Sequence, residues 1–168
     1  TDKGKNLLNP GADPKSNICF WAFYSSIVRA VYRHHLLLMT SVSSLNNSYR
    51  LGGHEAPPAI MSVFSGSVIY QMIESILNGE HFSDHSEASS LKVSDNMPEI
   101  KTDDTDRNRT SPFAFIGNRF EFRALGASMN ATAAAYILNS VVAESLNDFK
   151  KFVDAYQESG CSKEESIN

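Results

Sequence analysis

Apolar side chains recur every three or four residues in two well-separated parts of this chain. Such spacing places them on one face of an α-helix, so each part is predicted to be an amphipathic helix. The first predicted helix covers residues 16–34, where the stripe is Phe20, Phe23, Ile27, Val31 and His34. The second covers residues 131–156, where the stripe is Leu138, Val142, Leu146, Phe149 and Val153.

Turn-forming residues indicate where helices begin. Residues 9–14 are rich in Asn, Pro, Gly and Asp, and either Asp13 or Ser16 is placed to cap the helix that follows. Ser67 is placed in the same way before a third predicted helix, over residues 68–78.

Strands are predicted from shorter apolar or alternating runs. Residues 36–43 are apolar or small and uncharged, and residues 59–64 are similar, so each predicts a strand. The run 113–124 has the form of a β-hairpin, since Gly117-Asn118 fits a two-residue turn between its two halves.

The composition is that of a globular chain with one domain. Of 168 residues, 42% are hydrophobic and 20% are charged, which is enough apolar material for a core. We assign residues 1–158 to one domain, with an acidic surface loop inserted at 80–105 and a polar tail at 159–168. The loop assignment follows from its charges, because acidic residues outnumber lysines seven to two between positions 83 and 106.

Charge and cysteine content narrow the range of partners and compartments. The net charge of -4 gives no basic surface for nucleic acid. Cys19 and Cys161 have no metal-binding or disulfide spacing, so they are predicted to be free thiols in a reducing, cytoplasmic compartment. No apolar run approaches the roughly 20 residues that cross a bilayer, so no membrane partner is expected.

The first cluster with candidate chemistry is the run from Tyr49 to Pro58. It places Arg50 and then Glu55 between a Gly52-Gly53 pair and two prolines. A guanidinium can bind a carboxylate through two parallel hydrogen bonds, and a carboxylate on a glycine-flanked segment suits a closing loop. The alternative for both residues is a solvated surface side chain.

The second cluster carries three further charged positions on the predicted hairpin. It begins with Asp106-Arg107-Asn108-Arg109 and continues into the hairpin. Alternation along the second strand places Arg119, Glu121 and Arg123 on one face. Three charges on one face either lie in solvent or line a site, because isolated buried charges are costly.

Three short runs in these clusters resemble glutamine synthetases of the type III branch. They are residues 50–60 (RLGGHEAPPAI), 106–115 (DRNRTSPFAF) and 119–123 (RFEFR), with a weaker echo at residues 6–11. The resemblance extends over most of residues 4–153. It implies an ATP-dependent ligation of ammonia to the side-chain carboxylate of glutamate through an acyl-phosphate, giving glutamine.

The resemblance also implies roles for individual residues. Glu55 and Arg109 are the implied catalytic residues. The implied glutamate contacts are Arg50, Glu55, Arg109 and Arg123. Arg109 and Arg119 are implied to bind the nucleotide, and Glu121 to bind Mg²⁺ or Mn²⁺. Implied partners are glutamate, ammonia, ATP and further copies of the chain in a ring-shaped oligomer.

The sequence also departs from the family pattern. Of the family's metal-binding acids only Glu121 has a counterpart, and a phosphate-binding arginine is replaced in the region of Ala114 and Phe115. The predicted fold is therefore α+β, like the C-terminal side of a glutamine synthetase catalytic domain, incomplete at its N-terminal side. Antiparallel or mixed strands would pack against two long helices. The alternative is a non-catalytic, degenerate paralogue that binds a carboxylate metabolite or docks on a full-length synthetase.

Overall fold

The structure is a computed structural model that describes residues 1–44, 47, 61–78, 90–91, 100–101 and 111–160. In these ranges the helices are α1 (Ile18–Arg33), α2 (His35–Ser41), α4 (Ser67–Asn78) and α5 (Thr132–Glu158). The strands are β1 (Val63–Phe64), β2 (Ser90–Leu91), β3 (Ile100–Lys101), β4 (Phe113–Phe115) and β5 (Phe120–Phe122). The chain is therefore α+β, as predicted.

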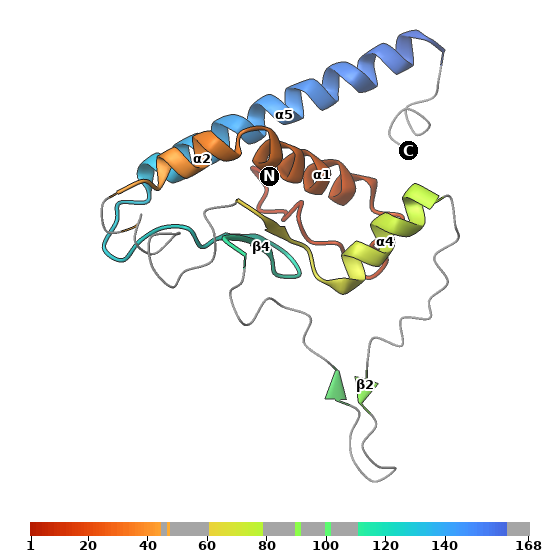
Figure 1. Ribbon diagram of the computed structural model, residues 1–168. Helices are drawn as coiled ribbons and strands as arrows, with labels where there is room; N and C mark the ends of the chain where they lie inside the picture. The colour runs from red at the N-terminus through yellow and green to blue at the C-terminus, as the bar shows by residue number, and fades with distance from the viewer. Residues whose placement is uncertain (45–46, 48–60, 79–89, 92–99, 102–110, 161–168) are drawn as a thin grey trace.

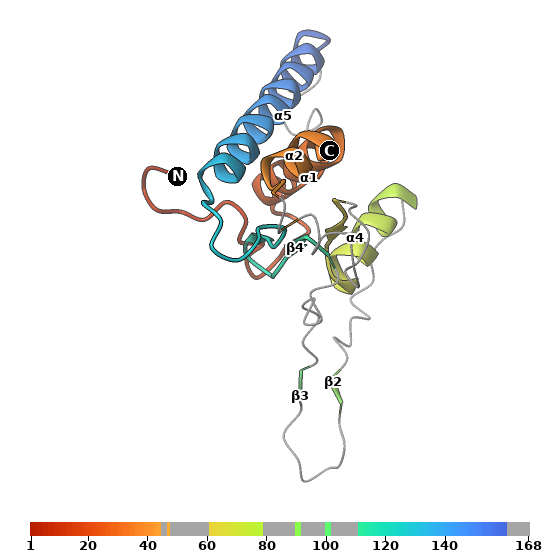
Figure 2. The ribbon, with the colours of Figure 1, turned by 60° about the vertical axis from the view of Figure 1, so that its left-hand side comes forward.

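Two layers of helix cover a small sheet. Figure 1 shows α1 and α2 between the long helix α5 and the strands, with α4 beside the sheet. The view in Figure 2 agrees, and shows α5 reaching well past α1 at its C-terminal end. Helices α1 and α2 thus pack on one side of the sheet, and α5 packs on their outer side.

The N-cap of helix α1 is neither of the two predicted residues. Asn17 is its N-cap, and the Asn17 side chain accepts a hydrogen bond of 3.1 Å from the N–H of Phe20. The prediction of Asp13 or Ser16 as the cap is wrong because these two residues bond to each other, from Ser16 Oγ to Asp13 Oδ2 at 2.6 Å. That bond lowers the pKa of the Asp13 carboxyl.

The prediction of a buried strand over residues 36–43 is wrong, since most of this run is helix α2. Short apolar runs do not distinguish a strand from a helix by periodicity. Only one face is covered here: Leu38 is fully buried, whereas Leu36 is 71% exposed. Thr40 Oγ1 donates to the Leu36 carbonyl at 2.8 Å, so a β-branched residue is accommodated in the helix.

The three-stranded sheet has the order β1-β4-β5 and is mixed. Strand β1 pairs with β4 in parallel, and β4 pairs with β5 antiparallel. The predicted hairpin is confirmed, because Ile116 N–H donates to the Arg119 carbonyl across Gly117 and Asn118. Gly117 has φ of 85°, which only glycine adopts readily and which fits the first position of a type II′ turn. Of the strand predicted over 59–64, residues 63–64 are confirmed, residues 61–62 are not strand, and residues 59–60 lie outside the described residues.

Aromatic rings connect the sheet to α1. Phe120 lies between two groups of buried side chains and contacts both. Its ring stacks on Phe113 at a centroid distance of 5.0 Å and on Tyr24 at 5.5 Å. Since Phe120 and Phe122 pack inward, the charged residues between and beside them are left on the other face of β5, as alternation predicted.

Helix α5 is confirmed over a slightly longer range than predicted, but its most buried face is rotated from the predicted stripe. The most buried positions are Ala134, Val141, Ser145 and Val153. Leu138 and Val142 pack at the edge of the core. Only Val153 is therefore both on the predicted stripe and buried.

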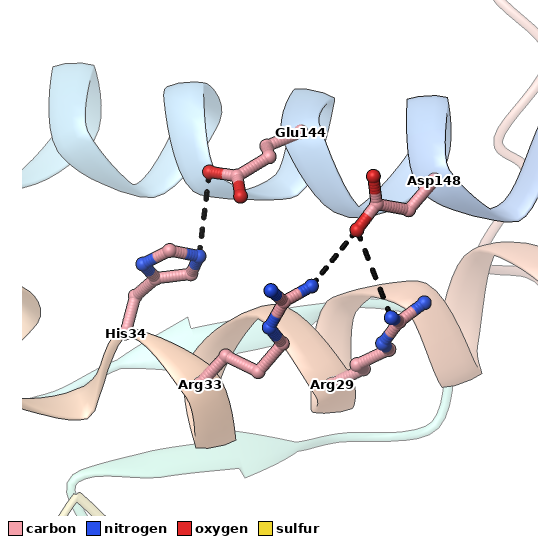
Figure 3. A network of polar contacts seen from close by, with 5 residues as sticks. All are labelled: Arg29, Arg33, His34, Glu144 and Asp148. Atoms are coloured by element: carbon pink, nitrogen blue, oxygen red, sulfur yellow. Dashed lines mark hydrogen bonds and ion pairs between the residues drawn. The ribbon is translucent and has the colours of Figure 1, made fainter.

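Polar contacts join α1 to α5 outside this core. Figure 3 shows Arg29 and Arg33 of α1 both directed at Asp148 of α5, with His34 facing Glu144 one turn earlier. The Arg33–Asp148 pair is the closest, at 2.8 Å, and Arg29 lies at 3.7 Å. The His34 Nε2 to Glu144 Oε2 distance is 3.4 Å. These contacts fix the rotation of α5 against α1 at the edge of the packed face.

Replacing Asp148 with asparagine is expected to lower the free energy of unfolding by about 0.5 to 1 kcal/mol, because partly exposed pairs have small energies. The loss should shrink as salt is raised. Asp154→Asn is the matched control, since its bond to Lys150 lies within α5 and joins no second element. Urea titrations at low and high salt measure both. Equal effects of the two substitutions would contradict a role for Asp148 between the helices.

Little of the acidic segment lies within the described residues. Ser90 pairs with Lys101 and Leu91 with Ile100 in an antiparallel ladder. The rest of the loop predicted at 80–105, and residues 161–168 of the predicted tail, lie outside them. No helix in the described part of the chain combines the length and apolar character needed to cross a membrane.

Candidate functional site

The segments that flank the charged clusters meet at one end of the sheet. We call it the gathered end, and it carries Ser62, Ser111 and Arg123. Because β1 and β4 are parallel, the residues that precede both strands arrive at the same end. Ser62 Oγ donates to Ser111 Oγ at 3.3 Å across this end. Strand β5 runs antiparallel to β4, so it finishes here too, and Arg123 N–H donates to the Pro112 carbonyl at 2.6 Å.

This arrangement bears on the residues that the sequence analysis singled out. Arg50, Glu55 and Arg109 lie outside the described residues. Arg109 is two positions before Ser111, and Glu55 is seven positions before Ser62. Ser62 and Ser111, which follow these two residues in the sequence, lie at the same end of the sheet as Arg123.

Glu121 and its two arginines form a charged row along β5. Arg123 Nε donates to Glu121 Oε2 at 2.9 Å, and Arg119 lies 3.9 Å from the other carboxylate oxygen. The Arg123 side chain is only 16% exposed, against 64% for Arg119. The prediction that these three side chains share a face is confirmed.

The ends of this row are in different surroundings. Arg119 lies at the hairpin turn, where the Asn118 carbonyl also accepts a bond of 2.8 Å from Asn6. Arg123 lies at the gathered end of the sheet. Their Cα atoms are about 13 Å apart along the chain, but both guanidiniums approach the single carboxylate of Glu121.

Glu121 does not by itself make a metal site. A divalent cation such as Mg²⁺ takes six oxygen ligands, which are usually one or two carboxylates together with waters and substrate phosphates. Among the described residues no group of three or more His, Cys, Asp or Glu side chains is placed to hold a metal ion. Glu121 is moreover paired with Arg123. The described residues therefore do not fit a complete cation site, although Glu121 can supply one ligand.

A mainly apolar hollow lies beside the hairpin turn. It has a volume of about 280 Å³ and is bounded by the start of α4, the N-terminal segment and the end of β4, with Gly66, Met72, Phe115 and Gly117 among its walls. Tyr24 donates a short hydrogen bond to Ser65 at its edge. Burial raises the pKa of the Tyr24 hydroxyl. This hollow is at the Arg119 end of the row.

Sequence reasoning missed the residues that fasten the gathered end. The sequence analysis singles out none of Asn47, Ser62 and Ser111. Asn47 is 2% exposed and bonds to the carbonyl of Ala124, next to Arg123. The sequence signal for this role of Asn47 is its amide side chain, because an amide that is buried usually has hydrogen-bond partners.

Comparison with known proteins identifies the relatives of this chain. It is 46% identical over 170 residues to the glutamine synthetase of Bacteroides fragilis, a match that covers 99% of this chain and 23% of that protein. It is also 46% identical over 147 residues to the type-3 glutamine synthetase of Dictyostelium discoideum, covering 87% and 20% respectively. The chain belongs with the glutamine synthetases. The resemblance found in three short motifs is thereby confirmed along most of the sequence.

The glutamine synthetase of Butyrivibrio fibrisolvens adds a third match, 44% identical over 121 residues and 72% of this chain. The chain spans about a fifth of the length of these relatives. No protein-family model matches it. The relationship is therefore to one part of a glutamine synthetase.

Proposed function

We propose that this chain supplies the glutamate-binding part of a glutamine synthetase site. In the proposed reaction, the side-chain carboxylate of glutamate takes the terminal phosphoryl group of ATP, giving an acyl-phosphate and ADP. Ammonia then attacks the acyl carbon and displaces phosphate, giving glutamine. The observation that carries the proposal is the convergence of Ser62, Ser111 and Arg123 at one end of the sheet, in a chain related to glutamine synthetases.

In this proposal the arginines hold the anionic groups of the substrates. Arg123 binds a glutamate carboxylate, and its low exposure favours a strong charge-assisted bond. Arg50 and Arg109 add further donors, and Arg109 and Arg119 bind the nucleotide phosphates. Fixed positive charge of this kind stabilises negative charge that builds up during phosphoryl transfer.

Glu55 is proposed as the acid–base residue. As a carboxylate it takes a proton from ammonium, which leaves neutral ammonia as the nucleophile. Its place between glycines and prolines suits a segment that closes over the acyl-phosphate and excludes water.

Glu121 is the residue proposed to contact Mg²⁺ or Mn²⁺, a cation that would neutralise phosphate charge when bound. Its remaining ligands would have to come from outside the described residues. Assembly into a ring of copies and a cytoplasmic location, both implied by the family, are part of the same proposal.

A second function is favoured by one observation. The described residues contain no complete cation site, which fits a degenerate paralogue that binds a carboxylate metabolite or docks on a full-length synthetase. The two functions differ in whether the chain can replace its counterpart in an active enzyme.

A hybrid enzyme separates the two functions. The stretch of the Bacteroides fragilis enzyme that aligns with this chain, 23% of that enzyme, is exchanged for the chain itself. Transfer of the γ-glutamyl group from glutamine to hydroxylamine is then measured with nucleotide, arsenate and Mn²⁺, for the hybrid, for its Glu55→Ala and Arg109→Ala variants, and for the chain alone. We expect an active hybrid, a loss of about 100-fold or more in each variant, and no activity of the chain alone. A folded, assembled but inactive hybrid would support the degenerate paralogue instead.

A further inference from the structure

The side chain of Asn47 joins two segments that are far apart in the sequence. It is 2% exposed. Its Nδ2 group donates to the Val42 carbonyl at 2.6 Å and to the Ala124 carbonyl at 2.8 Å. Val42 is the C-cap of α2, and Ala124 follows Arg123 directly. A single amide group thus holds the end of β5 against the end of α2.

The absence of a side chain at Gly126 leaves room for the side chain of Asn47. Gly126 lies so close that a Cβ there would be 3.2 Å from Asn47 Oδ1, tighter than side chains normally pack. Met129 makes a second connection between the same segments, since its sulfur accepts from Gly126 N–H at 3.3 Å and from Ser44 Oγ at 3.6 Å. Asn47 N–H also donates to Ser44 Oγ, at 3.2 Å.

The two bonds from Asn47 set the distance between Val42 and Ala124 more than they raise the free energy of unfolding. Asn47 Oδ1 is buried and has no hydrogen-bond partner among the residues the structure describes, which is energetically unfavourable. An aspartate or a leucine of similar size offers no N–H to either carbonyl. Only a side chain with two donors on one nitrogen spans Val42 and Ala124, so the amide specifies their separation.

One of the two joined segments carries Arg123, a residue of the proposed glutamate site. Arg123 is fixed on one side by its own N–H bond to Pro112, and on the other by the bond from Asn47 to the next carbonyl. Arg50 follows Asn47 by three positions in the sequence. We propose that Asn47 is a positioning residue that sets the place of Arg123 for glutamate. The inference rests on the proposed function, and it assigns Asn47 no contact with substrate.

Asn47→Leu is the informative substitution, because it keeps an uncharged side chain of similar size and removes both donors. In the hybrid enzyme we expect the KM for glutamate to rise about tenfold or more, since small misplacements of binding groups are costly. The KM for ATP should stay within about twofold, because Arg119 is held separately at the hairpin turn. Ser145→Ala is the matched control: this serine is equally buried on α5, its hydroxyl has no partner among the described residues, and no constant should change.

A second measurement uses the full chain without any assay of activity. Amide hydrogen exchange of Arg123 should speed up about tenfold or more in Asn47→Leu, while exchange at Val141 in α5 stays as in the unchanged chain. Unchanged exchange at Arg123 would overturn the positioning role, even if the hybrid proves inactive and the proposed function fails. An equal rise of both KM values together with faster exchange throughout α5 would also overturn it, since that is the result of a purely structural residue.

Discussion

Replacing Arg123 with lysine in the hybrid enzyme is expected to reduce kcat/KM for glutamate by about 10- to 150-fold. This is the effect of losing roughly 1.5 to 3 kcal/mol from a hydrogen bond to a charged group. Lysine keeps the positive charge but cannot present two parallel donors to a carboxylate. The side chain is also only 16% exposed, so water does not readily replace the missing donors.

Arg33→Lys is the matched control, because Arg33 is a half-exposed arginine on α1 that pairs with Asp148, away from the charged row. Steady-state kinetics with glutamate as the varied substrate should leave this control within about twofold of the unchanged hybrid. Equal losses in the two variants would indicate a general loss of stability. No loss in Arg123→Lys would remove Arg123 from the glutamate site.

Replacing Phe113 with alanine is expected to lower the free energy of unfolding by about 3 to 5 kcal/mol. The Phe113 ring is 1% exposed and lies 5.0 Å from the ring of Phe120 and 5.8 Å from that of Phe122. Like Ala114, it pairs with residues of both neighbouring strands. The substitution therefore leaves a cavity at the centre of the sheet, where the structure cannot easily collapse.

Phe152→Ala is the control for this prediction. Its ring is 55% exposed on α5 and contacts Tyr156, so its removal should change stability by about 0.5 kcal/mol or less. Urea unfolding followed by circular dichroism gives both midpoints. Similar midpoints for the two variants would mean that the sheet is not the stable centre of the molecule.

Local patterns in the sequence predicted the elements that depend on neighbouring residues. The hairpin around Gly117 and the helices over 18–33 and 132–158 follow from turn chemistry and three-to-four-residue spacing. The shared face of Glu121 and its arginines follows from strand alternation. For these features the energetic cause lies within a few residues along the chain.

The elements that were missed depend on partners far along the chain. Residues 36–43 were interpreted as a strand because their sequence is apolar, whereas packing around Leu38 makes most of them a helix. Asn47 looks like a turn residue until its bond to Ala124, 77 positions away, is known. The family resemblance suggested which charges act together, but not what holds their segments in place.

Two of the bonds that fasten the gathered end of the sheet span long stretches of chain. Ser62 and Ser111 are 49 positions apart, and Asn47 and Ala124 are 77. Large loops must close before such contacts form, and this slows folding and makes it depend on prior collapse. The helices can form early, whereas this end of the sheet can be completed only late. It is therefore also expected to be the part that opens first when the protein is mildly destabilised, so the proposed glutamate site should be lost before helical structure is.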